Sequence, residues 1–221
     1  MNVTEGKKLL IFDADSTLFD SDFSIYNCWL IIAKFYNREL FKDFDHFIDI
    51  SSKYHSNWQH YAVVELGFKE SDFDQIMKIW LNEVQPMYQS HTKWYDNMVY
   101  ILHELKNRGY IIAIATNNSK VLFDKLLKDE GFYELPIHDQ ISHKNVQKPE
   151  PNMIVDHMNN LGFSSYNTVV IGDSLVDLKA ARSAEVISVW ASYGSSLTEL
   201  EYEGYYDYIL KNPKCLLNIF N

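Results

Sequence analysis

The chain has 221 residues, of which 47% are hydrophobic and 23% are charged, a balance typical of a globular protein. This length allows one domain, or a core with an inserted subdomain. The formal net charge of −10, from 30 acidic and 20 basic residues, repels the backbone of nucleic acids. We therefore expect no nucleic-acid partner, whereas a small anion could bind if a divalent cation neutralised its site.

The cysteines and the N-terminal segment bear on the compartment. Cys28 and Cys215 are far apart and have no cysteine or histidine partner at metal-ligand spacing, which favours free thiols over a disulfide or a zinc site. The first apolar run, Leu9–Phe12, has only four residues and is too short for a signal peptide or a membrane span. We expect a cytoplasmic protein with no membrane partner.

The same run, Leu9–Phe12, is the first candidate strand. Apolar residues without alternation are typical of a strand that is buried on both faces of a parallel sheet. Asp13 and Asp15 follow it directly. Ligands bind at the carboxyl ends of strands in open α/β sheets. Two carboxylates there repel each other and cost desolvation energy, which predicts that a cation or a reaction uses them.

Residues 18–90 have only helical patterning. Phe23, Tyr26 and Leu30 recur at intervals of three and four positions, and Ile76, Ile79 and Trp80 continue such a pattern later. No run in this region has the character of a second parallel strand. We expect a helical insertion of three to five helices over residues 21–90, which closes near Pro86.

The alternation of strands and helices resumes at residue 92. Thr92 is a plausible N-cap for a helix over residues 92–105. The further expected elements, in order, are a strand at 110–116, a helix at 119–130, a weak strand at 138–142, a helix at 151–161, a strand at 168–173, a helix at 175–183, and strands at 186–190 and 208–210. This order predicts an α/β fold with a doubly wound parallel sheet, built from residues 1–20 and 91–221.

Polar residues follow several of these strands. Thr116 ends one strand, Lys148 lies just past another, and Asp173 ends a third, with Asp177 four residues later. Each alone has an ordinary structural explanation, because Asp and Thr are common in turns and helix caps and Lys is commonly solvated.

Taken together, these residues resemble the motifs of the haloacid dehalogenase superfamily, of the phosphatase type. The four matching stretches are Asp13-x-Asp15-x-Thr17, Thr116-Asn117, Lys148-Pro149 and Gly172-Asp173-Ser174-x-x-Asp177. The resemblance covers residues 7–20 and 92–211 and implies a Rossmann-like core. By its position alone, the helical insertion is similar to the type-one cap of that superfamily.

The resemblance implies a Mg²⁺-dependent phosphohydrolase that cleaves a small phosphomonoester through an aspartyl-phosphate. Asp13 would be the nucleophile, and Asp15 would protonate the leaving oxygen and then activate water. The metal ligands would be the carboxylates of Asp13 and Asp173 and the backbone carbonyl of Asp15. Asp177 would bind a metal water or orient these carboxylates from behind.

The other motif residues would bind the phosphoryl group. By the resemblance, Thr116 and the backbone N–H of Asn117 hold a phosphate oxygen, and Lys148 offsets the charge of Asp13 and the transferring group. One position departs from the pattern, because Ser16 stands where the superfamily usually has glycine. We expect an effect on rate rather than an inactive protein.

Alternatives to a phosphatase remain open. The dehalogenases lack the second acid of the first motif, so Asp15 argues against their chemistry. A phosphosugar mutase or phosphotransferase keeps every core residue, and a non-catalytic binding protein of this fold is the third possibility. For the substrate we expect a nucleoside monophosphate, a sugar phosphate or a phosphorylated short acid. The candidate contacts in the insertion are Arg38, Lys53, His55, Trp58 and His60.

Overall fold

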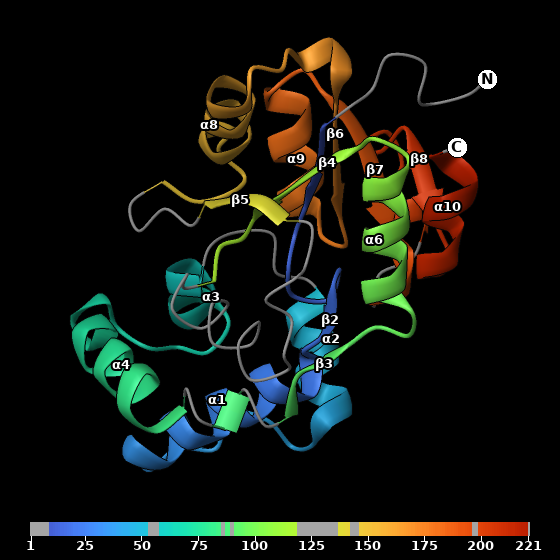
Figure 1. The fold of residues 1–221 in the computed structure, drawn as a ribbon. Coiled ribbons are helices and arrows are strands. Elements are labelled where there is room, and N and C mark those ends of the chain that lie inside the picture. Colours follow the sequence, from blue (N-terminus) through green and yellow to red (C-terminus); the bar gives the residue numbers. More distant parts are fainter. Residues whose placement is uncertain are drawn as a thin grey trace.

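A parallel sheet of six strands forms the centre of the molecule (Figure 1). The computed structural model describes residues 9–52, 58–84, 87–88, 91–118, 137–141, 146–195 and 199–220. The strand order is β5-β4-β1-β6-β7-β8, and every neighbouring pair is parallel. The strands are β1 Leu9–Phe12, β4 Ile111–Ala115, β5 Ile137–Ile141, β6 Thr168–Gly172, β7 Ile187–Ala191 and β8 Tyr208–Leu210. Because the chain runs outward from β1 in both directions, the predicted doubly wound fold is confirmed.

Helices cover both faces of the sheet (Figure 1). Leu10 and Phe12 point to the face that packs against α6 and α10, and Leu9 and Ile11 point to the face that packs against α8 and α9. This alternation explains why the whole strand is apolar. The helices of the core are α6 Met98–Asn107, α8 Asn152–Leu161, α9 Leu175–Ser183 and α10 Leu216–Ile219, with short turns η3 Ser165–Asn167, η4 Ser192–Gly194, η5 Glu199–Tyr202 and η6 Pro213–Cys215.

The register of the central strands brings their polar ends together. Phe12 is level with Ile114 of β4 and with Ile171 of β6. Asp13 continues the ladder, because its backbone N–H donates to the carbonyl of Ile171 at 2.8 Å. Residues that follow β1, β4 and β6 therefore lie at one edge of the sheet, where a parallel α/β fold binds ligands.

A helical insertion lies below this edge in the view of Figure 1. Its elements are α1 Asp22–Phe35, α2 Phe44–Ser52, α3 Trp58–Val64, η1 Glu70–Asp72, α4 Phe73–Ile79 and the π-helical turn η2 Trp80–Val84. Aromatic side chains fill its centre. The ring centroids of Trp29 and Tyr61 are 5.7 Å apart, and those of Trp29 and Phe68 are 6.2 Å apart. Its buried residues join the core cluster that contains Phe12, so insertion and sheet share one hydrophobic core.

A two-stranded antiparallel ribbon connects the insertion to the sheet. Strand β2, Phe19–Asp20, pairs with β3, Lys93–Trp94. The expected helix over residues 92–105 is therefore wrong in its first turns, and α6 begins at Met98 after Asn97, whose φ is +64°. Pairing of Lys93–Trp94 with β2 overrides the capping signal at Thr92, whose hydroxyl instead donates to the carbonyl of Tyr88 and lies 2.9 Å from Ser24 Oγ. The helix expected at 119–130 lies outside the described residues.

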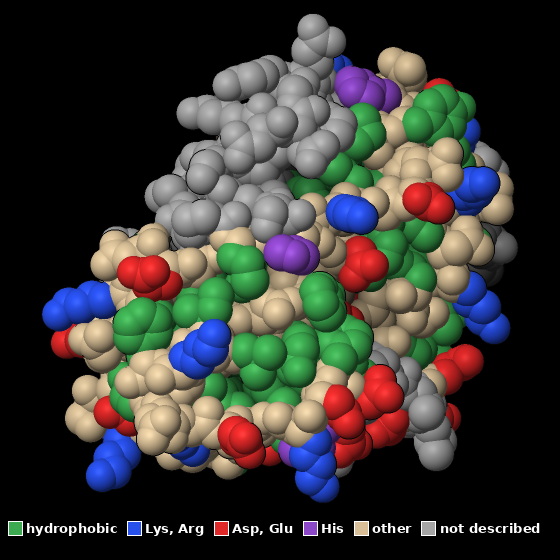
Figure 2. All heavy atoms as spheres, turned by 90° about the horizontal axis from the view of Figure 1, so that it is seen from below, with side chains coloured by type: hydrophobic (Ala, Val, Ile, Leu, Met, Phe, Trp, Pro, Cys, Tyr) green, Lys and Arg blue, Asp and Glu red, His purple; other side chains and the backbone are tan. Residues whose placement is uncertain are grey.

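Several apolar side chains of the insertion are exposed. Phe23, Phe35 and Leu81 have exposed fractions of 49%, 57% and 50%. Figure 2, a view from below, shows hydrophobic side chains gathered on this face among charged and other polar ones. Single exposed apolar residues are normal in globular proteins.

No helix in the described part of the chain has the length and apolar character that crossing a membrane requires.

Candidate active site

Three carboxylates meet at the edge of the sheet. Asp13 follows β1, Asp173 follows β6, and Asp177 lies in the first turn of α9. One carboxylate oxygen from each lies within 4.8 Å of the others. Asp177 is 2% exposed and Asp13 is 8% exposed. Since carboxylate oxygens at such separations suit a hard divalent cation and the waters bound to it, this cluster fits a magnesium ion.

Lys148 neutralises part of this charge. Its ammonium nitrogen lies 2.5 Å from Asp13 Oδ1, 2.5 Å from Asp177 Oδ1 and 2.6 Å from the carbonyl oxygen of Ala115. An ammonium group has three hydrogens, so all of them have acceptors. Burial alone lowers the pKa of Lys148, but Asp13 and Asp177 outweigh burial and raise it. The lysine is therefore held as a buried cation.

The loops after β4 and before α8 fix the position of Lys148. Asn117 pairs with the backbone of Lys148 through both ends of its side-chain amide, with Oδ1 accepting from the N–H at 2.9 Å and Nδ2 donating to the carbonyl at 3.1 Å. Thr116 Oγ1 accepts from the backbone N–H of Asn118 at 3.0 Å. The second and third motifs are thus joined directly, and the side chain of Asn117 has a role beyond the backbone N–H that the sequence indicated.

Burial disfavours the charged forms of Asp13 and Asp173. The pKa of Asp13 is raised to about 7, because burial and the neighbouring Asp177 and Asp15 outweigh the attraction of Lys148. Burial, with Asp177 and Asp13, raises the pKa of Asp173 well above its ordinary value. A bound cation would offset the repulsion among these carboxylates and favour their charged forms.

Asp15 lies two residues beyond Asp13, in the loop between β1 and β2. Burial raises the pKa of its carboxyl, against the opposing effect of a hydrogen bond from Asn118. Tyr88 Oη donates to Asp15 Oδ1, and Asn118 Nδ2 donates to Asp15 Oδ2 at 2.9 Å. Both oxygens of the expected acid and base are therefore held by side chains that come from other segments.

The turn that follows Asp15 requires a left-handed residue. Ser16 has a φ of +56°, in the region that favours glycine, which accounts for the glycine usual at this position. Its hydroxyl donates to Asp22 Oδ1 at 2.8 Å. Gly194 lies so close that an added Cβ would be 1.5 Å from the carbonyl oxygen of Ser16. The loop after β7 thus supports the loop after β1.

Two further residues tie this loop to Asp173. Thr17 Oγ1 donates to Asp173 Oδ1 at 3.0 Å, and Tyr193 Oη donates to the carbonyl of Thr17 at 2.8 Å. Trp190 Nε1 donates to the carbonyl of Asp173 at 3.0 Å. No local sequence pattern marks Tyr193, Trp190 or Tyr88 as site residues, whereas Asn118 adjoins the Thr116-Asn117 motif.

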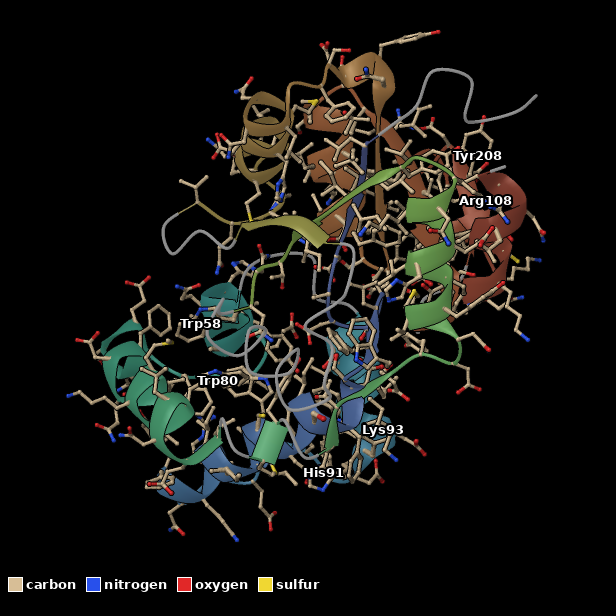
Figure 3. The ribbon with its side chains drawn as sticks, viewed as in Figure 1. Trp58, Trp80, His91, Lys93, Arg108 and Tyr208 are labelled. Atoms are coloured by element: carbon tan, nitrogen blue, oxygen red, sulfur yellow. The ribbon has the colours of Figure 1, made fainter. Side chains whose placement is uncertain are left out.

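Two of the candidate contacts in the insertion, Arg38 and Trp58, contact other residues of the insertion. The Arg38 guanidinium donates to the carbonyls of Leu66 and Gly67, at 2.5 and 3.3 Å, and lies over the Phe68 ring. The Trp58 ring packs on Phe73 of α4, with centroids 5.2 Å apart. Figure 3 shows Trp58 in the helical insertion.

His60 is an exposed residue of α3. Lys53 and His55 lie outside the described residues.

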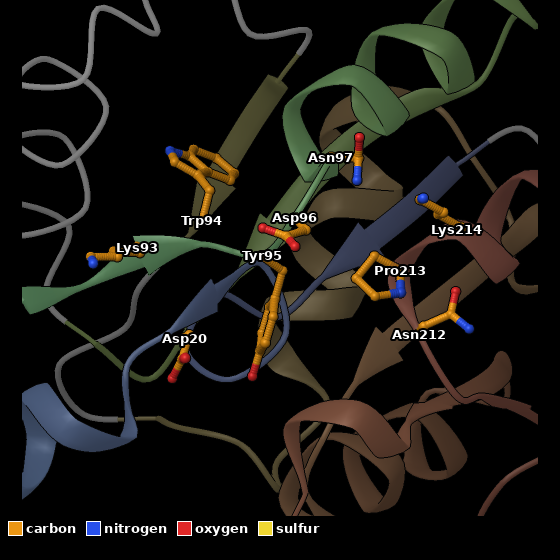
Figure 4. A pocket seen from close by; sticks show the side chains of 9 residues that line it. All are labelled: Asp20, Lys93, Trp94, Tyr95, Asp96, Asn97, Asn212, Pro213 and Lys214. Atoms are coloured by element: carbon orange, nitrogen blue, oxygen red, sulfur yellow. The ribbon is translucent and has the colours of Figure 1, made fainter.

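A surface pocket of about 710 Å³ lies along the β2–β3 ribbon (Figure 4). Its lining residues come from the ribbon, from the segment before α6 and from the region of η6: Asp20, Lys93, Trp94, Tyr95, Asp96, Asn97, Asn212, Pro213 and Lys214. None of them belongs to the acidic cluster, so this pocket is separate from the candidate active site.

Comparison with known families agrees with this site. A family model described as haloacid dehalogenase-like hydrolase matches residues 10–191, which include every motif residue described above. The chain belongs to the haloacid dehalogenase-like hydrolases. The family resemblance expected from the sequence is confirmed.

Curated relatives cover nearly the whole chain. A phosphoglycolate phosphatase from Agrobacterium fabrum is 24% identical over 202 residues, which are 87% of this chain and 85% of that protein. A phosphoglycolate phosphatase from Colwellia psychrerythraea is 27% identical and covers 88% of each chain. With the family match, they confirm the prediction of a phosphatase-type hydrolase.

Solved structures share the fold. A haloacid dehalogenase-like family hydrolase from Streptococcus pneumoniae superposes with a TM-score of 0.80 at 17% identity, covering 98% of this chain and 99% of that one. A hydrolase from Pseudomonas syringae gives 0.78 at 20% identity, covering 96% of both chains. At these identities the likeness concerns the fold.

Proposed function

We propose that the protein is a Mg²⁺-dependent phosphatase that cleaves a small phosphomonoester through an aspartyl-phosphate. The observation that carries this proposal is the cluster of Asp13, Asp173 and Asp177 at the edge of the sheet, with Lys148 paired to Asp13 and Asp177. A phosphate ester is anionic, so a carboxylate can attack it only where cations offset the charge. Lys148 supplies one positive charge, and the carboxylates supply ligands for a second cation, the metal ion.

The metal would be held by the carboxylates of Asp13 and Asp173 and by the backbone carbonyl of Asp15. Bound there, Mg²⁺ supplies electrostatic stabilisation of the transferring phosphoryl group. Asp177 is better suited to orient the site than to bind the metal directly. Its Oδ1 accepts from Lys148, and its Oδ2 accepts from the backbone N–H and the hydroxyl of Ser174.

Asp13 would attack phosphorus, and Lys148 would hold the attacking carboxylate in place and offset its charge. Thr116 and the backbone N–H of Asn117 would bind a phosphoryl oxygen. Asp15 would protonate the leaving oxygen and later deprotonate the hydrolytic water. Its raised pKa supports this role, because the carboxyl must be able to hold a proton near neutral pH.

For the substrate we propose a small phosphorylated metabolite. The names of the curated relatives make phosphoglycolate, a phosphorylated short acid, the first candidate, with sugar phosphates and nucleoside monophosphates next. We propose residues 1–20 and 91–221 as the catalytic core and residues 21–90 as a cap that excludes bulk water. The free thiols of Cys28 and Cys215 support a reducing, cytoplasmic location.

The proposal is tested by phosphate release from a panel of these monoesters. Wild type and Asp13→Asn are each assayed with Mg²⁺ and with a chelator, and Asp45→Asn, at an exposed position of α2, is the matched control. We expect turnover that requires Mg²⁺, persists in Asp45→Asn and is lost in Asp13→Asn. Turnover by Asp13→Asn, or turnover in the chelator, would contradict the proposal.

A further inference from the structure

Three segments meet at the Asp15 carboxyl. Tyr88 Oη donates to one oxygen and Asn118 Nδ2 donates to the other at 2.9 Å. Asn118 Nδ2 also lies 3.2 Å from Tyr88 Oη, so the three side chains form a closed triangle. Asp15 follows β1 and Asn118 follows β4, whereas Tyr88 belongs to the segment that returns from the helical insertion to β3.

Tyr88 is fixed in this position from both ends. The residue is 1% exposed, so its hydroxyl needs a partner within the protein. Its carbonyl accepts from the backbone N–H of Thr92 at 3.1 Å and from the Thr92 hydroxyl at 2.8 Å. Its ring lies against Trp80, with centroids 6.3 Å apart. The hydroxyl therefore reaches Asp15 from a residue whose ring and backbone contact other parts of the protein.

These contacts fix the orientation of a group whose reaction depends on direction. A carboxylate that is held at both oxygens cannot rotate freely, and small misplacements of a reacting group reduce rates strongly. Each carboxylate oxygen has two lone pairs, so one accepted hydrogen bond per oxygen leaves a site for the transferred proton. The triangle is thus compatible with proton transfer.

We propose that Tyr88 is a positioning residue that, together with Asn118, orients the Asp15 carboxyl toward the leaving oxygen. This orientation then depends on the packing of the insertion against the core. The inference rests on the proposed function, in which Asp15 is the acid and base. It gives the insertion a part in the chemical step in addition to covering the site.

The test is the dependence on the leaving group in Tyr88→Phe, which keeps the ring and removes the hydroxyl. An alkyl phosphomonoester needs protonation of its leaving oxygen, whereas p-nitrophenyl phosphate has a leaving group that needs little. General acid catalysis contributes about 10²–10⁴-fold, so a misaligned acid loses part of that factor. We expect kcat/KM to fall at least about tenfold for the alkyl ester and less than about threefold for p-nitrophenyl phosphate.

The matched control is Tyr61→Phe, which removes another buried hydroxyl of the insertion, 3.0 Å from Ser51 Oγ. Both substrates should react with it as with wild type. Equal loss for both substrates in Tyr88→Phe, or no loss, would overturn the positioning role. If the wild type turns over neither ester, the proposed function fails. That outcome differs from an active wild type whose Tyr88→Phe variant loses activity equally for both esters.

Asn118→Ala provides a second variant should Tyr88→Phe fail to fold, which a thermal melt would reveal. It should produce the same selective loss for the alkyl ester. Where both variants fold, the double variant should lose less than the product of the single losses, because both act through Asp15. Multiplicative losses would contradict action through one carboxyl.

Discussion

Lys148 at the edge of the sheet and Arg38 in the helical insertion are both cations with several acceptors, but the acceptors differ in kind. Lys148 donates to two carboxylates and a carbonyl and is 3% exposed. Arg38 is exposed and donates to two backbone carbonyls. A buried cation among acids needs those acids for its stability, whereas Arg38 stabilises a turn. The buried cation of the core thus balances the charge of the acidic cluster, whereas the cation of the insertion stabilises the local backbone.

Lys148→Met should have the largest effect. Removing one member of a buried ion pair leaves uncompensated carboxylates, which costs about 3–5 kcal/mol of unfolding free energy. Phosphatase turnover should also be lost, because Asp13 loses its cationic partner. Denaturant unfolding and phosphate release measure both effects, with Lys93→Met, at an exposed lysine of β3, as the control. Wild-type turnover in Lys148→Met would contradict the distinction between Lys148 in the core and Arg38 in the insertion.

Gly194→Ala should disturb the core site from outside the motifs. The added methyl group would overlap the Ser16 carbonyl oxygen, and overpacking of this kind costs about 1–3 kcal/mol. Since the shifted loop bears Asp15, kcat/KM should fall as well. Gly109→Ala is the control, because its φ of +85° strains the backbone while an added Cβ meets no atom within 4 Å. A variant of Gly194 with normal activity would contradict the support that we assign to this loop.

Binding of Mg²⁺ should depend on pH. Asp13 has an ordinary pKa of 3.8, and burial raises it to about 7 in the fold. Without metal, this group stabilises the fold below pH 4 and loses that contribution as the pH rises through about 7. Below the pKa of Asp13, Mg²⁺ must displace the proton, which costs about 1.4 kcal/mol of binding free energy for each pH unit. Mg²⁺ should therefore raise Tm more at pH 8 than at pH 5.5, and the reverse order would contradict the assignment of Asp13.

Arg38→Ala should have the smallest effect. Loss of its hydrogen bonds to Leu66 and Gly67 should lower the unfolding free energy by about 1 kcal/mol. Because the guanidinium is engaged with the backbone, kcat/KM should not change. A rise in KM without loss of stability would return Arg38 to the role of a substrate contact.

The core could be predicted because its strands are unalternated apolar runs that end in polar residues. Leu9–Phe12 and Thr168–Gly172 carry that signal within a few residues, and the acids that follow them lie together in the structure. The ribbon of β2 and β3 could not be predicted, because strands of two residues have no period.

The contact between Tyr88 and Asp15 has no local signal either, because it joins residues that are 73 positions apart. Which insertion residues face the site depends on how the helices pack, and this packing places Arg38 on a turn rather than among the acids. Exposure and direction of such side chains are tertiary properties, so residue type alone did not reveal them.

The central claim is that Asp13 becomes phosphorylated, and the most direct test is the acid-quenched enzyme. After brief reaction with the best substrate of the panel in Mg²⁺, intact mass and peptide mapping locate any phosphoryl group. We expect one phosphoryl group on the peptide that contains Asp13, and none in Asp13→Asn. A phosphoryl group on another residue, or turnover with an enzyme that is never phosphorylated, would contradict it.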